Sequence, residues 1–86
     1  RLGLVHRVVP GDELMTAARE HAELIAANAP VAVRLTKRAA YRSLNADLET
    51  ALELAASFQG IAQNTQDHLE AVEAILGKRE PEFHGK

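Results

Sequence analysis

Apolar side chains recur every three or four positions through most of the chain, which is the periodicity of amphipathic helices. One such stripe is formed by Leu69, Val72, Ile75 and Leu76. Polar side chains occupy most of the positions between the apolar ones. The pattern therefore predicts four helices, at residues 12–28, 31–43, 46–62 and 66–77.

The expected helix ends carry residues suited to terminating helices. Asp12, Asn45 and Thr65 precede the first, third and fourth helices, and short polar side chains of this kind accept N–H bonds as N-caps. Pro30 disfavours helical geometry in the residue before it, so it separates the first two helices. Gly77 is expected to end the fourth helix.

Residues 4–9 are short, rich in β-branched side chains and followed by a Pro-Gly pair, which predicts one strand and a turn. A single strand cannot satisfy its own backbone N–H and C=O groups. We therefore expect its sheet to come from sequence outside these residues. This expectation favours a fragment of a larger protein.

The composition predicts an incomplete core. The chain has 86 residues and only three aromatic ones, Tyr41, Phe58 and Phe83. Alanine is the commonest residue, and small side chains bury little apolar area each. We expect the helices to bury their apolar faces against missing sequence or against partner subunits.

Charge and residue usage narrow the function classes. The net charge of −2 favours neither nucleic acid nor an anionic membrane as partner. With no cysteine, the chain has no disulfide, thiolate zinc site or thiol nucleophile. His68 with Glu70 lacks the two-histidine spacing of a helical zinc site, so no metal is expected. No apolar run is long enough to span a membrane, and a cytoplasmic location is the default.

Four basic residues lie on the second predicted helix with no acid among them, while six acids and no Lys or Arg lie within residues 45–73. One interpretation is a phosphate or nucleic-acid contact. The favoured interpretation is a solvated face, or one paired with acids of packed helices or of another subunit. The basic residues are Arg34, Lys37, Arg38 and Arg42.

No catalytic group is predicted within these residues. Glu49 and Glu53 share a helix face, but an exposed acidic face lacks the closed site that shifts a pKa. His21, beside Glu20, is expected to be a solvated surface histidine.

Residues 67–83 follow the pattern D-x-x-E-A-V-x-A-[apolar]-x-x-K-R-x-P-x-F. This pattern, with Lys37 and the opening residues 3–10, resembles the carboxy-terminal part of the crotonase family, the enoyl-CoA hydratases and isomerases. The resemblance implies a mainly α segment, the C-terminal helical region of a crotonase-like α/β fold. It also implies a division into the last strand and turn of the core (1–11), a connecting helix (12–29) and an oligomerisation and pocket-completing region (30–86).

The resemblance implies no catalytic residue in this chain, because the family's oxyanion hole and acid/base glutamates precede this segment. It implies two contacts with the CoA moiety of an acyl-CoA substrate, and no prosthetic group. Ile75 would lie near the adenine, where the family often has phenylalanine, and Lys78 would reach the phosphates. The alternative for Lys78 is a charge partner for the negative end of the last helix.

The leading hypothesis is the C-terminal portion of an enzyme that adds water to, or moves a double bond in, an acyl-CoA, assembled as a trimer or a dimer of trimers. One alternative is a stand-alone helical protein-interaction module that uses the acidic helices. Another is a helical DNA-binding domain, which the net charge opposes. The isolated strand opposes both alternatives.

Overall fold

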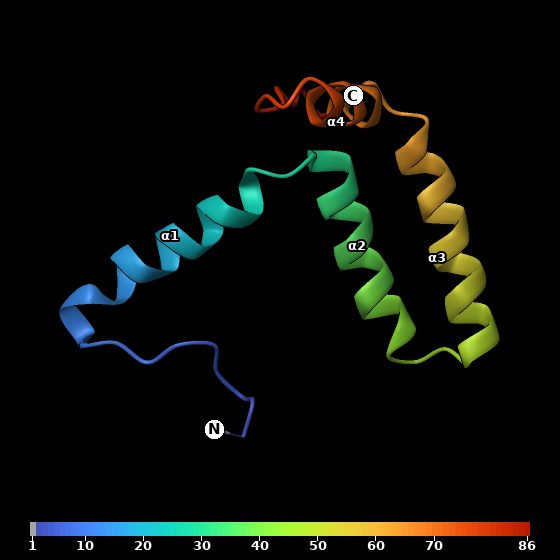
Figure 1. Cartoon of the computed structure of the whole chain (residues 1–86). Coiled ribbons are helices and arrows are strands. Elements are labelled where there is room, and N and C mark those ends of the chain that lie inside the picture. Colours follow the sequence, from blue (N-terminus) through green and yellow to red (C-terminus); the bar gives the residue numbers. More distant parts are fainter. Residues whose placement is uncertain (1) are drawn as a thin grey trace.

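The helices α2 (Pro30–Ser43) and α3 (Leu48–Gln63) run antiparallel side by side, and α1 (Leu14–Ala26) projects from them (Figure 1). This computed structural model describes residues 2–86. The mainly helical class and the four helices predicted from the periodicity are confirmed. In chain order the elements are η1 (Gly11–Glu13), α1 (Leu14–Ala26), α2 (Pro30–Ser43), α3 (Leu48–Gln63) and α4 (Gln66–Leu76).

The strand predicted at residues 4–9 is wrong. These residues are irregular, and no strand occurs anywhere in residues 2–86. A strand exists only through ladder hydrogen bonds to a neighbour, and the described part of the chain supplies no neighbour. Val8, whose type favoured a strand, remains 86% exposed.

The first and third helices begin later than predicted. Asp12 caps nothing and instead lies inside η1, where the N–H of Glu13 donates to the carbonyl of Pro10 at 3.0 Å. The third helix is capped by Asp47 rather than Asn45, since Asp47 Oδ1 accepts from the N–H of Thr50 at 2.8 Å. Both predicted caps, Asp12 and Asn45, are therefore wrong.

Three other predicted boundary residues, Thr65, Pro30 and Gly77, are confirmed, whereas the first helix ends at Ala26 rather than at residue 28. Thr65 Oγ1 accepts the N–H of His68 at 3.1 Å and so caps α4. Pro30 is the first residue of α2, where its missing N–H leaves no helical hydrogen bond unmade. Gly77 follows the last residue of α4 as its C-terminal cap.

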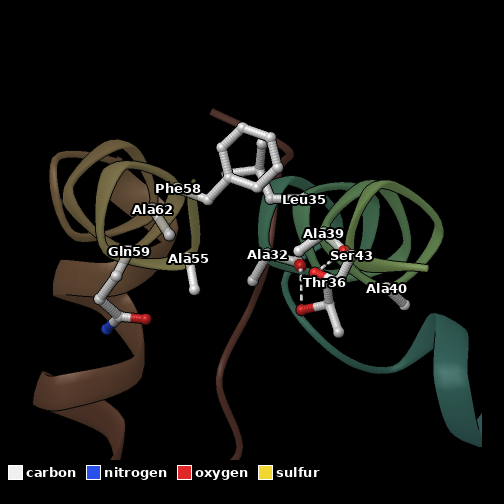
Figure 2. A pocket seen from close by; sticks show the side chains of 10 residues that line it. All are labelled: Ala32, Leu35, Thr36, Ala39, Ala40, Ser43, Ala55, Phe58, Gln59 and Ala62. Atoms are coloured by element: carbon white, nitrogen blue, oxygen red, sulfur yellow. Dashed lines mark hydrogen bonds between the residues drawn. The ribbon is translucent and has the colours of Figure 1, made fainter. Parts of the chain in front are cut away.

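Small residues let α2 and α3 approach closely. Figure 2 shows Leu35 of α2 and Phe58 of α3 pointing toward each other over the gap between the helices, with alanines below them. The guanidinium of Arg38 lies 5.7 Å from the centre of the Phe58 ring, a cation–π contact between the two helices. Ten residues line the shallow groove beneath: Ala32, Leu35, Thr36, Ala39, Ala40, Ser43, Ala55, Phe58, Gln59 and Ala62.

The predicted incomplete core is confirmed. Among residues 2–86, Ala74 is the only buried apolar residue and Asp67 the only buried charged one. The radius of gyration is 16.3 Å, whereas a compact domain of this length has about 12 Å. Large apolar side chains stay exposed on α1, α2, α3 and α4, among them Leu24, Tyr41 and Leu52. Within residues 2–86 no helix has the length and apolar character to cross a bilayer.

Candidate functional site

The chain reverses direction at the C-terminal end of α4 through a Schellman motif. The N–H of Arg79 donates to the carbonyl of Ala74 at 2.9 Å, and that of Lys78 to the carbonyl of Ile75 at 3.2 Å. These bonds require a left-handed residue, and Lys78 provides it with a φ of 52°. Gly77, the residue expected to provide the stop, stays right-handed with a φ of −83°.

Placing a lysine in the left-handed region is costly, because its Cβ crowds the following carbonyl oxygen. Glycine usually occupies this position. Here the glycine is one residue earlier, where an added Cβ would lie 3.2 Å from the carbonyl oxygen of Glu73. Gly77 therefore permits close approach to the helix, and Lys78 bears the strained conformation.

Glu70 of α4 holds the first half of the C-terminal tail, residues 79–86. Both of its carboxylate oxygens accept from the guanidinium of Arg79, Oε2 at 3.1 Å. Oε1 also accepts the backbone N–H of Glu82 at 2.9 Å. The hydrogen bonds from Arg79 first, and from Glu82 second, lower the pKa of Glu70 to about 2, from a usual 4.5.

Asp67 holds the second half of the tail. Its Oδ1 accepts the N–H of His84 at 2.8 Å, and its Oδ2 accepts the N–H of Gly85 at 2.7 Å. In return, its own N–H donates to the carbonyl of Lys86 at 2.9 Å. Asp67 is 1% exposed, and burial of such a group is tolerated when hydrogen bonds replace water. We call Asp67 and Glu70 the tail clasp.

The two faces of α4 have different roles. At 100° per residue, Asp67, Glu70 and Ala74 lie on one face, which is covered by the tail. Leu69 and Leu76 lie on the opposite face and are exposed. The apolar stripe predicted from the sequence therefore exists, and it stays exposed in residues 2–86, from 41% at Val72 to 79% at Leu76.

The two predicted contact residues, Ile75 and Lys78, lie together at the C-terminal end of α4. Ile75 is 75% exposed, and Lys78 is exposed as well. The ammonium of Lys78 has no hydrogen bond or ion pair with any of residues 2–86. Both side chains are thus open to a ligand.

Sequence reasoning missed the tail clasp. From the sequence, Asp67 and Glu70 are only two of the six acids within residues 45–73. The available signal was their spacing of three, which places them on one face, followed by Arg79 and Pro81 after the helix end. Hydrogen-bond partners that lie nine to eighteen residues apart produce no periodic pattern in the sequence.

The basic residues of α2 do not pair with the acidic helices inside the described chain. The two ion pairs within residues 2–86 are Arg7–Glu20 and Arg79–Glu70, and neither involves α2. Arg38 instead contacts Phe58. Pairing across subunits stays a prediction.

Other candidates form no closed site. Glu49 and Glu53 are exposed on α3. His21 is exposed, and its ring lies against that of His6 with centroids 4.4 Å apart, a contact the sequence did not suggest. In residues 2–86 no group of three His, Asp or Glu side chains is placed to hold a metal ion.

Comparison with known proteins gives the family. The family model described as enoyl-CoA hydratase/isomerase matches residues 1–86. A short-chain-enoyl-CoA hydratase from Clostridium acetobutylicum is 43% identical over 82 residues, covering 95% of this chain and 31% of that protein. A crotonyl-CoA hydratase from Syntrophomonas wolfei is 36% identical over 86 residues, covering 100% of this chain and 33% of that protein.

Solved structures agree with these relatives. An enoyl-CoA hydratase from Bacillus anthracis matches with a TM-score of 0.91 and 40% identity over 98% of this chain and 33% of its own. An enoyl-CoA hydratase/isomerase from Mycobacterium paratuberculosis matches with a TM-score of 0.92 and 36% identity, over 99% and 34%. The chain belongs to the enoyl-CoA hydratase/isomerase family, the crotonase family, and spans about a third of the length of these relatives.

Proposed function

We propose that this chain is the C-terminal portion of an enzyme acting on acyl-CoA thioesters, by hydration or by double-bond migration. The observation that carries the proposal is the exposed, unpartnered ammonium of Lys78 on a strained backbone, beside exposed Ile75. Strained residues persist where surrounding contacts fix them, and they cluster at ligand sites. The relatives, named as hydratases of enoyl-CoA and crotonyl-CoA, supply the substrate class.

The acid/base chemistry belongs to residues outside this chain. A general acid needs a pKa raised toward the working pH. The two carboxyls with shifted values move the other way: hydrogen bonds from Thr50, first from its side chain and then from its N–H, lower the pKa of Asp47, and Arg79 lowers that of Glu70. Both shifts follow from structural hydrogen bonds.

Lys78 is suited to a CoA phosphate, because a flexible ammonium acts as an adaptable point charge. Ile75, one turn earlier on the same helix end, offers an apolar side chain to the adenine. No prosthetic group is required by this role. The CoA moiety is part of the substrate.

The test replaces Lys78 by Ala in the complete enzyme. We expect KM for a CoA ester to rise about fivefold, equivalent to about 1 kcal/mol of a charge-assisted hydrogen bond, with kcat unchanged. A pantetheine thioester, which lacks the distal phosphates, should be unaffected. Lys86→Ala is the matched control. Only the backbone carbonyl of Lys86 accepts a hydrogen bond, so the substitution removes a lysine ammonium without removing that bond. An equal loss with both substrates would make Lys78 a helix-end charge.

We further propose that the exposed faces serve assembly into a trimer or a dimer of trimers, as part of an oligomerisation and pocket-completing region at 30–86. Leu69 and Leu76 of α4 are apolar and exposed, and contiguous surfaces of this kind mark interfaces. Sedimentation of the complete enzyme tests this proposal, and a monomer at micromolar concentration would contradict it. The cytoplasmic location stays a prediction.

A further inference from the structure

Lys78 lies between two anchored segments. Before it, α4 is closed by the bonds from Lys78 to Ile75 and from Arg79 to Ala74. After it, the side chain of Arg79 is held by Glu70 through two hydrogen bonds. The residue on each side of the strained position is therefore fixed by contacts with the same helix.

The rest of the tail extends this anchoring. Glu82 donates to Glu70, while His84 and Gly85 donate to Asp67. Gly85 also approaches the first residue of α2, since a Cβ added to it would lie 3.7 Å from Cβ of Pro30. The tail is thus fixed along its length against α4 and against the start of α2.

The direction of the Lys78 side chain depends on this anchoring. The left-handed φ of 52° sets the direction of the Cα–Cβ bond, and that conformation is unfavourable for a residue with a Cβ. The two bonds that close α4 also need this conformation, and the contacts of Arg79 and Glu82 with Glu70 add a second restraint on it. Its side chain has no contact of its own within residues 2–86 that would restore the direction.

We propose that Asp67 and Glu70 are positioning residues for Lys78: they hold the tail that fixes the left-handed backbone from which the ammonium reaches a phosphate of CoA. The assignment rests on the proposed function of Lys78. It adds to a phosphate site two acids with the same sign of charge as the phosphate, which act through the backbone rather than through contact with the ligand.

The decisive experiment is a double-mutant cycle in the complete enzyme. Glu70→Gln should raise KM for a CoA ester about two- to threefold at constant kcat, and leave a pantetheine thioester unchanged. In a Lys78→Ala background the same substitution should have no further effect, because the positioned group is gone. Glu73→Gln is the control, since it removes the same charge from α4 without touching a tail N–H.

A second measurement reports on the backbone directly. Amide exchange at Glu82 should accelerate in Glu70→Gln, and at His84 and Gly85 in Asp67→Asn. Arg79→Gln tests the same contact from the other partner if Glu70→Gln folds poorly.

The outcomes separate the two proposals. If Lys78→Ala raises KM but neither Glu70→Gln nor Arg79→Gln does, the positioning role is wrong and the ligand role stands. A Glu70→Gln effect that persists in the Lys78→Ala background also overturns the positioning role. If Lys78→Ala leaves KM unchanged, both proposals fall.

Discussion

Residues 2–9, the N-terminal arm, and residues 79–86, the C-terminal tail, both lie outside the helices and have no regular structure of their own. Three amide groups of the tail donate to carboxylates of α4, and a fourth bond joins Asp67 to the carbonyl of Lys86. The arm touches α1 through side chains, with a 3.6 Å ion pair between Arg7 and Glu20 and the rings of His6 and His21 in contact.

The difference shows what holds irregular backbone in place. A segment without a helix or sheet must find partners for its N–H and C=O groups elsewhere. Carboxylates on a neighbouring helix provide those partners for the tail. Within residues 2–86 none is provided for the backbone of residues 2–9. Its side-chain contacts are exposed and contribute little.

The largest effect is expected from Asp67→Ala, which removes the partner of two tail amides at once. Because hydrogen bonds to a buried carboxylate are strong, the free energy of local opening at His84 and Gly85 should fall by about 2 kcal/mol. Native-state amide exchange of the full-length protein measures this. Asp12→Ala, at an acid without a capping role, should leave the same amides unchanged. Unaltered protection in Asp67→Ala would show that other contacts hold the tail.

The next effect concerns pH and Glu70. Its pKa is lowered to about 2 in the folded state, so its contribution to stability is complete above about 4.5 and is lost as the pH falls through 2. An NMR titration of the Glu70 carboxyl should show a midpoint near 2. In Arg79→Gln the midpoint should move toward 4.5, because the largest cause of the shift is removed. A midpoint near 4.5 in the unmodified protein would contradict the ion pair.

The features that depend on residues close together in the sequence could be predicted from it. The helices follow from periodicity, and the cap at Thr65 and the stop at Gly77 follow from residue type. The predicted start of the third helix lies too early in the chain. Asn45 and Asp47 are both good N-caps, and an apolar residue at position 48 is compatible with either cap.

Contacts between distant residues could not be read in the same way. A strand needs a partner strand, which residue type alone does not supply. The clasp joins Asp67 to Gly85, eighteen residues away, with no repeating pattern between them. The positions of Ile75 and Lys78 at one helix end could be predicted, whereas the left-handed backbone of Lys78 could not, because a glycine stands beside it.

A smaller effect of opposite sign is expected from Lys78→Gly. Glycine adopts the left-handed conformation without steric cost, so the substitution should stabilise the end of α4 by about 1 kcal/mol. Lys78→Ala is the matched control, because it keeps the Cβ and therefore the strain. Amide exchange at Arg79, whose N–H closes the motif, should slow only in the glycine variant. Equal exchange in both variants would mean that the strain is absent.

The smallest effect is expected from Arg7→Ala in the arm. The ion pair with Glu20 joins side chains that are 58% and 62% exposed, and such pairs contribute less than about 1 kcal/mol, often nothing measurable. Amides of Val8 and Val9 have no hydrogen-bond acceptor within residues 2–86, so their exchange should already be fast and should not change. His6→Ala, which removes the ring contact with His21, is the parallel variant. Protection of these two amides in the full-length protein, whether or not Arg7 is present, would show that the arm finds a backbone partner beyond the described residues.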